Sequence, residues 1–569
     1  MFVKDARFGA RVGRRRMRRH TEESLSSGNR HSLGNPERQL ASVAYITTRA
    51  AEVHPDRLAI DDQLSGRKVT YRELEQEINR TARVLADLGL VKGDLLATMF
   101  PNDLDAVVIL FAAAKLGVIV CPVNVRLLPQ EVAAYLESHG VRGVACSSTF
   151  CERFNGVGAT VRVAFGGTIP DGWTDAAEAK RGVSDAGLAP VTSMDDPFRM
   201  IPTGGTTGVS KGVVHSHGGT LMTVLTNIAD FGIRRGWKTV LIAPAYHGAG
   251  MDWGLFPILW RAGTVIMPPE ASFNPATYFR LLREHAIEYA LLVPATIGPM
   301  HRTWDRVPIT TVKTLISTSA PTSPALREKL AEMFPTADLL AGAGISESLN
   351  MAIQSPGDFL TFSAGIGEPH LDTRLCIVDL EGREVSRGER GEICLRGFNT
   401  ALYYHGNEEA SRRVWRKRAD DPEGLEWCFT GDIGVMDADG RVSIVDRSKD
   451  IILTGGETVP SVEIENAFGG HPRIRECAAV GLTDDRWGEA ITLVVVKSSP
   501  DDDNAGLARD LFTFGRTRLS GYKLPKQIAF VDALPRSHFG KLLKRELREM
   551  KYQELHRPEG AAAPVQSRA

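Results

Sequence analysis

The segment from residue 202 to 212, PTGGTTGVSKG, gathers the groups that proteins use to hold a phosphate. Its glycines allow backbone N–H groups to approach an anion, its hydroxyls donate further hydrogen bonds, and Lys211 supplies positive charge. A P-loop NTPase is excluded, because its motif places Gly-Lys before Ser or Thr, whereas Lys211 stands between Ser210 and Gly212. The segment therefore predicts a phosphate site of another kind, and a flexible hydrophilic turn is the alternative.

Further polar motifs follow this segment along the chain. They are PAYHGAG (244–250), STSAP (317–321), GAGISES (342–348), FTGDIG (429–434), DRSKDIILTGGETVPSVEIE (446–465) and LPRSHFGKLLKREL (534–547). Together with residues 202–212, the series resembles the adenylate-forming enzymes, the superfamily of AMP-forming acyl-CoA synthetases, peptide-synthetase adenylation domains and luciferases. The resemblance covers roughly residues 40–550. The order of the whole set makes it specific, since each motif alone would be an ordinary loop.

The resemblance implies that the earlier motifs form an ATP site. Glu347 is implied as the Mg2+ ligand, a task that suits a carboxylate because Mg2+ prefers oxygen ligands and bridges them to substrate phosphates. His247 is implied to lie beside the acyl pocket. The residues implied to contact the nucleotide are Thr203, Gly204, Gly205, Thr206, Thr207, Gly208 and Lys211 in the phosphate loop, Ser319, Ala320 and Pro321 on the adenine side, and Gly342, Ala343, Gly344 and Ser346 before Glu347.

The later motifs imply the ribose site, the hinge and the path of the second substrate. Asp432 is implied to accept hydrogen bonds from both ribose hydroxyls, which a carboxylate can do at once. Arg447 is implied to reach the ribose or a phosphate. By the same resemblance, Lys449 is the hinge, and Gly455 and Gly456 line the path of the thiol.

The implied reaction has two steps. The substrate carboxylate attacks the α-phosphate of ATP, and positive charge from Lys541, Lys211 and Mg2+ stabilises the crowded anionic transition state while pyrophosphate leaves. The small domain then rotates, which withdraws Lys541 and guides a pantetheine thiol to the acyl carbonyl. The activity implied is that of an acid–thiol ligase, a carboxylate–CoA ligase with ATP or AMP, Mg2+ and coenzyme A as cofactors. Its implied catalytic residues are Lys541, Glu347, His247 and Lys211.

Several positions depart from the family pattern, and most of them lie on the ATP side. Gly204 replaces the usual serine and lacks a hydroxyl for the leaving phosphates, while Ala343 replaces the tyrosine that packs on the adenine. The other departures are Ser210 for proline, Thr318 and Ser319 for two glycines, and His538 and Phe539 for small or amide residues. We therefore expect weakened adenylation and better use of preformed acyl-AMP, which a partner enzyme would supply.

The residues after His247 bear on the acyl substrate. A roomy apolar pocket is predicted by Met251, Trp253, Leu255 and Phe256 with the small Gly248, Ala249 and Gly250. Such a pocket fits a fatty, aryl or polycyclic carboxylic acid. Asp252 is the one nearby acid that could meet the ammonium group of an amino-acid substrate.

Two alternative functions stay open at this point. The first is an enzyme that loads a carrier-protein pantetheine instead of CoA, since both acceptors end in the same arm. The second is a catalytically inactive nucleotide-binding protein, against which the joint presence of Lys541, Glu347 and Asp432 argues. The sequence also leaves the oligomeric state open, a homodimer included.

Composition limits the other kinds of partner. The 68 basic and 69 acidic side chains nearly balance, so nothing favours nucleic-acid binding. The seven scattered cysteines indicate thiols in a reducing compartment, which predicts a cytoplasmic protein. The most apolar stretch, 106–123, is interrupted by Lys115 and Gly117, and it predicts a buried helix and strand instead of a membrane span.

The 569 residues, of which 43% are apolar, predict an α/β fold with at least two domains. Leu74, Ile78, Ala82, Leu85 and Leu88 recur at helical spacing before Gly89, and residues 370–397 alternate like strands joined by turns. We expect a large N-terminal domain of α/β layers with a β-rich subdomain, and a small mobile α+β C-terminal domain. The expected boundaries are a basic disordered extension (1–38), the large domain (39–446), the hinge (447–450), the small domain (451–553) and a disordered tail (554–569).

Overall fold

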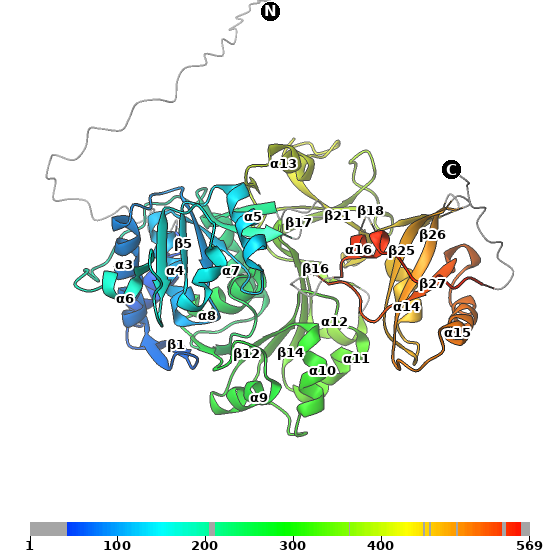
Figure 1. The fold of residues 1–569 in the computed structure, drawn as a ribbon, viewed down its shortest axis with the longest axis horizontal. Coiled ribbons are helices and arrows are strands. Elements are labelled where there is room, and N and C mark those ends of the chain that lie inside the picture. The colour runs from blue at the N-terminus through cyan, green and yellow to red at the C-terminus, as the bar shows by residue number, and fades with distance from the viewer. Residues whose placement is uncertain are drawn as a thin grey trace, which may run out of the picture.

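The computed structural model describes residues 42–203, 211–362, 365–447, 450–454, 457–484, 487–536 and 542–558. A large N-terminal part contains three sheets, and a smaller C-terminal part, drawn in orange and red in Figure 1, contains a fourth. Helices cover the faces of the two larger sheets (Figure 1). This architecture confirms the predicted α/β fold with a β-rich subdomain and a small second domain. The residue boundaries of the domains stay predictions.

An eight-stranded sheet carries the phosphate segment at one side. Its strands, in spatial order, are β19 (Tyr403–Tyr404), β9 (Lys211–Ser216), β8 (Pro197–Thr203), β4 (Ile119–Pro122), β3 (Leu95–Met99), β5 (Gly143–Ser147), β6 (Val161–Phe165) and β7 (Thr174–Asp175). The strands from β8 to β7 run parallel, whereas β9 pairs antiparallel with both β8 and β19. The helices nearest to it in sequence are α3 (Tyr71–Asp87), α4 (Leu104–Leu116), α5 (Pro129–His139), η1 (Ser148–Phe154), α6 (Ala176–Ala179) and α7 (His217–Asp230).

A nine-stranded sheet carries the motifs of the adenine side. Its strands, in order, are β16 (Glu368–Pro369), β15 (Ser348–Gln354), β14 (Asp338–Ile345), β13 (Thr314–Ser317), β12 (Tyr289–Leu292), β10 (Lys238–Val240), β11 (Thr264–Met267), β1 (Leu58–Asp62) and β2 (Arg67–Thr70). Its central strands are parallel. The associated helices are α2 (Tyr45–Val53), η2 (Ala249–Leu255), α8 (Phe256–Trp260), α9 (Pro275–Glu284), α10 (Pro294–Thr303), α11 (Pro324–Met333) and α12 (Pro356–Thr361).

Two smaller sheets follow. The β-rich subdomain consists of β17 (Thr373–Val378), β18 (Arg390–Gly397), β20 (Trp415–Lys417), β21 (Glu426–Met436) and β22 (Val442–Arg447), with α13 (Glu408–Val414) beside them. The C-terminal sheet consists of β23 (Ile452–Thr454), β24 (Glu457–Val459), β25 (Ile474–Asp484), β26 (Gly488–Lys497) and β27 (Gln527–Phe530), with α14 (Ser461–Phe468), α15 (Asn504–Arg516), η3 (Gly521–Lys523) and α16 (Lys544–Glu549). It has buried apolar clusters of its own, built from residues after 451.

Helix α3 shows why the sequence pattern was informative. Its periodic residues Leu74, Ile78 and Leu85 are fully buried. Thr70 and Glu73 form a reciprocal capping box at its start, which satisfies two backbone N–H groups that the helix leaves unpaired. Gly89 follows the helix with a φ of +94°, a conformation that glycine adopts without steric cost.

The apolar stretch 106–123 forms most of α4 and then β4, as predicted. Lys115, which interrupts it, is a buried member of the helix, and its ammonium group lies 2.6 Å from Glu75 Oε1 on α3. Gly117 ends α4 with a φ of +69°. Within the described part of the chain, none of the helices combines the length and the apolar character that crossing a bilayer requires.

Candidate active site

The two ends of the phosphate segment are held side by side. Thr203, the last residue of β8, pairs with Lys211, the first of β9. The residues between them, which include the predicted Gly204, Gly205, Thr206, Thr207 and Gly208, lie outside the described residues, so their roles stay predictions. At Gly212 a Cβ atom would come 2.3 Å from Met200 Sδ, so the residue after Lys211 has no room for a side chain.

Glu347 lies in the turn between β14 and β15, and the fold brings it to Lys211. The hydroxyl of Tyr404 on β19 donates a hydrogen bond to Glu347 Oε1 at 2.6 Å. On the same tyrosine, the Lys211 ammonium group lies 4.7 Å from the ring centroid. A carboxylate and an ammonium group from different sheets thus contact the same tyrosine, the first at its hydroxyl and the second at its ring face.

The sequence analysis did not identify Tyr404. Burial and the neighbouring charge of Glu347 raise the pKa of the Tyr404 hydroxyl, so it remains a hydrogen-bond donor at neutral pH. The register of β19 against β9, with Tyr404 opposite Val213, places it there. This long-range strand pairing has no signal in the sequence around either residue.

On the adenine side, the turn after β13 contains Thr318 and Ser319, which stand where the family usually has two glycines. Ser319 adopts a φ of +74°, in the left-handed region that favours glycine. Thr318, at the other departure, donates a hydrogen bond from Oγ1 to the backbone oxygen of Gly342 at 2.9 Å. The predicted Ser319, Ala320 and Pro321 are exposed, and Thr318 ties their turn to β14.

Gly342, Ala343 and Gly344 lie at the end of β14. A Cβ atom on Gly342 would come within 2.4 Å of the Trp253 ring, so that indole packs directly on the strand backbone. Successive side chains of a strand point to opposite faces. Trp253 therefore does not replace the aromatic ring that the family has at the position of Ala343.

His247 lies two residues before η2, a π-helix over Ala249–Leu255. Two of its backbone oxygens accept hydrogen bonds from buried side chains: Asp252 O from Asn227 at 2.9 Å and Trp253 O from Tyr289 at 2.7 Å. Burial, and next the positive charge of Arg199, lowers the pKa of His247, which keeps its imidazole neutral at pH 7. Short π-helical turns occur frequently at functional sites.

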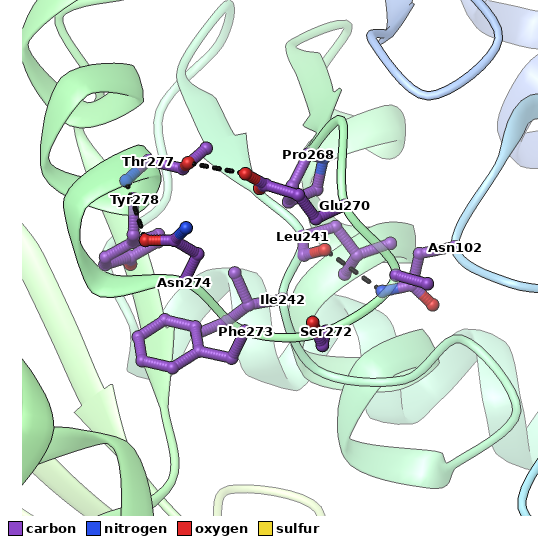
Figure 2. Close-up of a pocket in the computed structure, with 11 residues that line it drawn as sticks. Asn102, Leu241, Ile242, Pro268, Glu270, Ser272, Phe273, Asn274, Thr277 and Tyr278 are labelled. Atoms are coloured by element: carbon purple, nitrogen blue, oxygen red, sulfur yellow. Dashed lines mark hydrogen bonds between the residues drawn. The ribbon is translucent and has the colours of Figure 1, made fainter.

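Asn102, which the sequence analysis also missed, fixes the loop before His247. Its Nδ2 donates to Leu241 O at 3.0 Å and to Ala243 O at 2.9 Å, and its Oδ1 accepts from Ala245 N at 2.8 Å. Figure 2 shows Asn102 with its bond to Leu241 at one side of a small pocket. The pocket holds about 40 Å3, room for a few water molecules but not for a fatty or aryl group. In the sequence, the only sign of a role for Asn102 is that the polar pair Asn102–Asp103 directly precedes the long apolar helix α4.

The structure contradicts one interpretation of the acyl site, the role of Asp252, and does not support a second. Asp252 is already paired with Arg199 and is not positioned to bind a substrate ammonium group. Its two oxygens lie 2.6 and 2.7 Å from Arg199 Nη2, and both side chains are fully buried. Met251, Leu255 and Phe256 are fully buried in the core of the large domain. These apolar residues therefore stabilise the fold, and the roomy pocket predicted from them is not supported.

On the ribose side, Asp432 and Arg447 are directly opposite each other on β21 and β22. Asp432 is buried, and its backbone N–H donates to Thr430 Oγ1 at 3.0 Å. Two residues predicted to act on the same ligand thus occupy one rung of a ladder.

Of the later predicted residues, Lys449, Gly455, Gly456 and Lys541 lie outside the described residues. Their neighbours form defined contacts. Arg548 on α16 bonds to Asp450 Oδ1 at 2.9 Å. Lys544 at the start of α16 lies 2.8 Å from Glu465 of α14. These contacts fix the helix that begins three residues after Lys541.

The described residues contain no group of three or more His, Cys, Asp and Glu side chains that could hold a metal ion. A single carboxylate such as Glu347 fits Mg2+ well, because this ion usually binds proteins through one or two carboxylates and completes its shell with phosphates and water. Glu347 also shares a contact to Tyr404 with Lys211, the cation predicted to bind the same phosphates. The residues present therefore fit a nucleotide-bound Mg2+ better than a metal held by protein alone.

Comparisons with known proteins agree with this arrangement. A family model described as AMP-binding enzyme matches residues 47–405, and one described as AMP-binding enzyme C-terminal domain matches residues 463–541. A fatty acid–[acyl-carrier-protein] ligase, ScoC from Streptomyces coeruleorubidus, is 32% identical over 90% of this chain and 96% of its own. A feruloyl-CoA synthase from Amycolatopsis is 29% identical over 88% of this chain and 97% of its own.

Solved structures show the same fold. ATP-bound MatB from Rhodopseudomonas palustris aligns with a TM-score of 0.79 and 26% identity, over 89% of this chain and 98% of its own. A fatty acyl-CoA synthetase from Mycobacterium tuberculosis aligns with a TM-score of 0.71 and 27% identity, over 90% of this chain and 98% of its own. The cofactors predicted from the sequence, ATP or AMP with Mg2+ and CoA, are those of this group of enzymes. The chain belongs to the AMP-binding enzyme family and is an AMP-forming acid–thiol ligase.

Proposed function

We propose that the chain activates a carboxylic acid as acyl-AMP and transfers the acyl group to the pantetheine thiol of CoA. The observation that carries this proposal is the contact of both Lys211 and Glu347 with Tyr404, at the end of the phosphate segment. A fixed cation and a fixed carboxylate at that place suit the triphosphate of ATP. The relatives named for feruloyl and for fatty substrates support an aryl or fatty acid.

In this proposal each residue has one task. Lys211 binds phosphate oxygens, and Asp432 accepts hydrogen bonds from the ribose hydroxyls. Glu347 would hold Mg2+, which neutralises phosphate charge when bound. Lys541 places its ammonium group between the attacking carboxylate and the α-phosphate, where negative charge accumulates in the transition state. Neutral His247 borders the acyl group, at the end of the loop that Asn102 fixes.

The proposal includes a bias toward the second step. Gly204 cannot donate a hydroxyl hydrogen bond to pyrophosphate, which is present only during adenylation. Such a bond to a charged acceptor contributes about 1.5–3 kcal/mol, equivalent to roughly a ten- to a hundredfold change in rate. The missing ring at Ala343 does not add to this bias, because it would loosen AMP in both steps; Trp253, which packs on the neighbouring Gly342, does not replace it. A partner enzyme that supplies acyl-AMP would bypass the weakened step.

The test measures acyl-CoA formation from two substrate sets side by side. One set is a panel of fatty and aryl carboxylates with ATP, Mg2+ and CoA, and the other is the matching acyl-AMP with CoA. We expect thioester from both and a faster reaction from acyl-AMP. Equal rates of thioester formation from the two sets would contradict the bias toward the second step but not the proposed function. Absence of thioester from every member of both sets would contradict the function.

A carrier protein is the second candidate acceptor. The observation in its favour is the 32% identity to a protein named as a fatty acid–[acyl-carrier-protein] ligase. Supplying either CoA or a phosphopantetheinylated carrier protein, with the same acyl-AMP, separates the two acceptors. If the acyl group is transferred to the carrier protein and not to CoA, the carrier protein replaces CoA as the acceptor in the proposal.

A further inference from the structure

The turn that carries Glu347 is held from outside at three points. His215 Nε2 lies 2.8 Å from Ser346 O, Ala401 N donates to Glu347 O at 2.9 Å, and the Tyr404 hydroxyl donates to Glu347 Oε1 at 2.6 Å. The turn belongs to the nine-stranded sheet, whereas His215 and Tyr404 lie on β9 and β19 of the eight-stranded sheet. The carboxylate is therefore fixed relative to the phosphate segment by contacts between two sheets.

Tyr404 contacts both predicted phosphate-side groups. It is 4% exposed, and its ring packs edge-on against Trp415 with 5.0 Å between centroids. Its hydroxyl engages one oxygen of Glu347, and its ring face lies 4.7 Å from the Lys211 ammonium group. Because the ring is packed in place, neither group can change its position without losing a contact to it.

His215 acts on the main chain of the same turn. It is 1% exposed, and burial, with the charge of Arg199 second, lowers its pKa to about 3. The imidazole is therefore neutral at pH 7. Since Ser346 O can only accept, Nε2 carries the hydrogen and donates to it. An apolar side chain at this buried position would leave the Ser346 carbonyl without this donor.

We propose that Tyr404 is a positioning residue that sets the metal affinity of Glu347 and the placement of Lys211, and that His215 fixes the turn on which Glu347 lies. The proposal rests on the proposed function, in which Glu347 holds the ion of the metal–ATP complex. It assigns two residues outside the family motifs recognised in the sequence, and each acts through another residue.

The experiment measures Mn2+ binding by electron paramagnetic resonance, with the full chain and saturating ATP but without carboxylate, so that no turnover occurs. Tyr404→Phe keeps the ring and removes the hydroxyl, and we expect it to weaken Mn2+ binding about ten- to a hundredfold. Tyr404→Leu also removes the ring face and should weaken binding about two- to fivefold further. Tyr403→Phe, which removes the hydroxyl of the adjacent exposed tyrosine on β19, is the matched control and should bind as the wild type does.

Glu347→Gln separates failure of this inference from failure of the proposed function. If Glu347→Gln binds Mn2+ as tightly as the wild type, the metal role in the proposed function is wrong. If Glu347→Gln weakens binding and Tyr404→Phe does not, the inference on Tyr404 is overturned. Adding Tyr404→Phe to Glu347→Gln should not weaken Mn2+ binding further, because Tyr404 acts through Glu347. If the double variant loses as much additional affinity as Tyr404→Phe loses alone, the inference is also overturned.

His215 has its own pair of variants. His215→Gln retains an N–H donor and should keep Mn2+ binding within about twofold of the wild type, whereas His215→Leu removes the donor and should weaken it by at least about fivefold. Thermal unfolding without ligand shows that each variant is folded at the temperature of the titration. If both variants bind as the wild type does, or both are weakened equally, the role of His215 is overturned.

Discussion

Arg199 on β8 and Asp252 in η2 form an ion pair in which both side chains are completely buried, with Nη2 to oxygen distances of 2.6 and 2.7 Å. Removing one partner of such a pair leaves an uncompensated charge, at a cost of about 3–5 kcal/mol. We expect Arg199→Met to lower the free energy of unfolding by this amount, measured by urea denaturation. Adding Asp252→Asn should restore part of it.

The exposed pair Arg412–Glu408 provides the control for that measurement, because both side chains are more than three-quarters exposed. Arg412→Met should leave the stability nearly unchanged. A small effect of Arg199→Met would show that the buried pair is not maintained in solution.

Ser319→Gly should stabilise the protein. The φ of +74° at Ser319 strains an L-residue by about 1 kcal/mol, and glycine relieves this strain while losing some of the gain to its greater freedom in the unfolded chain. We expect a rise in melting temperature of a degree or more. Ser323→Gly, at a φ of −63°, has no such strain to relieve and should lower the melting temperature.

Acid should destabilise the fold through His217 at a pH where most carboxylates are still ionised. Burial lowers the pKa of His217 to about 3, against an ordinary value of 6.5. Between these values the unfolded chain binds a proton that the folded chain does not, so stability falls as the pH falls below about 6.5, by up to about 1.4 kcal/mol per pH unit.

The comparison is the free energy of unfolding at pH 7 and pH 5.5. His217→Asn keeps an acceptor for the Val43 N–H, which lies 3.1 Å from Nδ1 in the wild type. The variant should lose less stability between the two pH values than the wild type does. Equal losses would mean that His217 is protonated in the folded state at pH 5.5.

Lys541→Ala should reduce adenylation by at least about a hundredfold, because a transition-state charge partner is lost. Pyrophosphate exchange measures this step. Thioester formation from supplied acyl-AMP should survive, since the proposed function gives Lys541 no task in that step. Lys551→Ala, an exposed lysine of the same C-terminal segment, should affect neither step. Equal losses in both steps would contradict the separation of roles.

Lys449→Pro should uncouple the two steps by restricting the backbone at the predicted hinge. We expect one half-reaction to persist and overall turnover from carboxylate, ATP and CoA to fall. The measurement is a comparison of pyrophosphate exchange, transfer from acyl-AMP and the complete reaction. Unchanged turnover would place the hinge elsewhere.

The sequence predicted those features that depend on local patterns. Helix α3 follows from its apolar period and its capping residues, and the α/β arrangement follows from alternating elements. The roles of Glu347, Lys211 and Asp432 come from the motifs that contain them, and these roles stay predictions. Each of these predictions depends on residues that are close together in the chain.

The contacts that were missed join distant segments. Tyr404 reaches Glu347 because a two-residue strand pairs with β9, and Asn102 reaches Ala245 across the edges of two sheets. Asp252 was misinterpreted for the same reason, since its partner Arg199 lies on strand β8. Burial of a charged group is decided by what packs around it, which a local pattern does not encode.

The backbone pairing of Asp432 on β21 with Arg447 on β22 places the predicted ribose ligand next to the predicted hinge. Arg447 is the last residue of β22, and the predicted hinge begins at this residue. A rotation of the C-terminal part about the predicted hinge, residues 447–450, would therefore begin at a strand end that is paired with Asp432. If Asp432 binds the ribose as proposed, a bound nucleotide would contact the strand that pairs with the one leading into the predicted hinge.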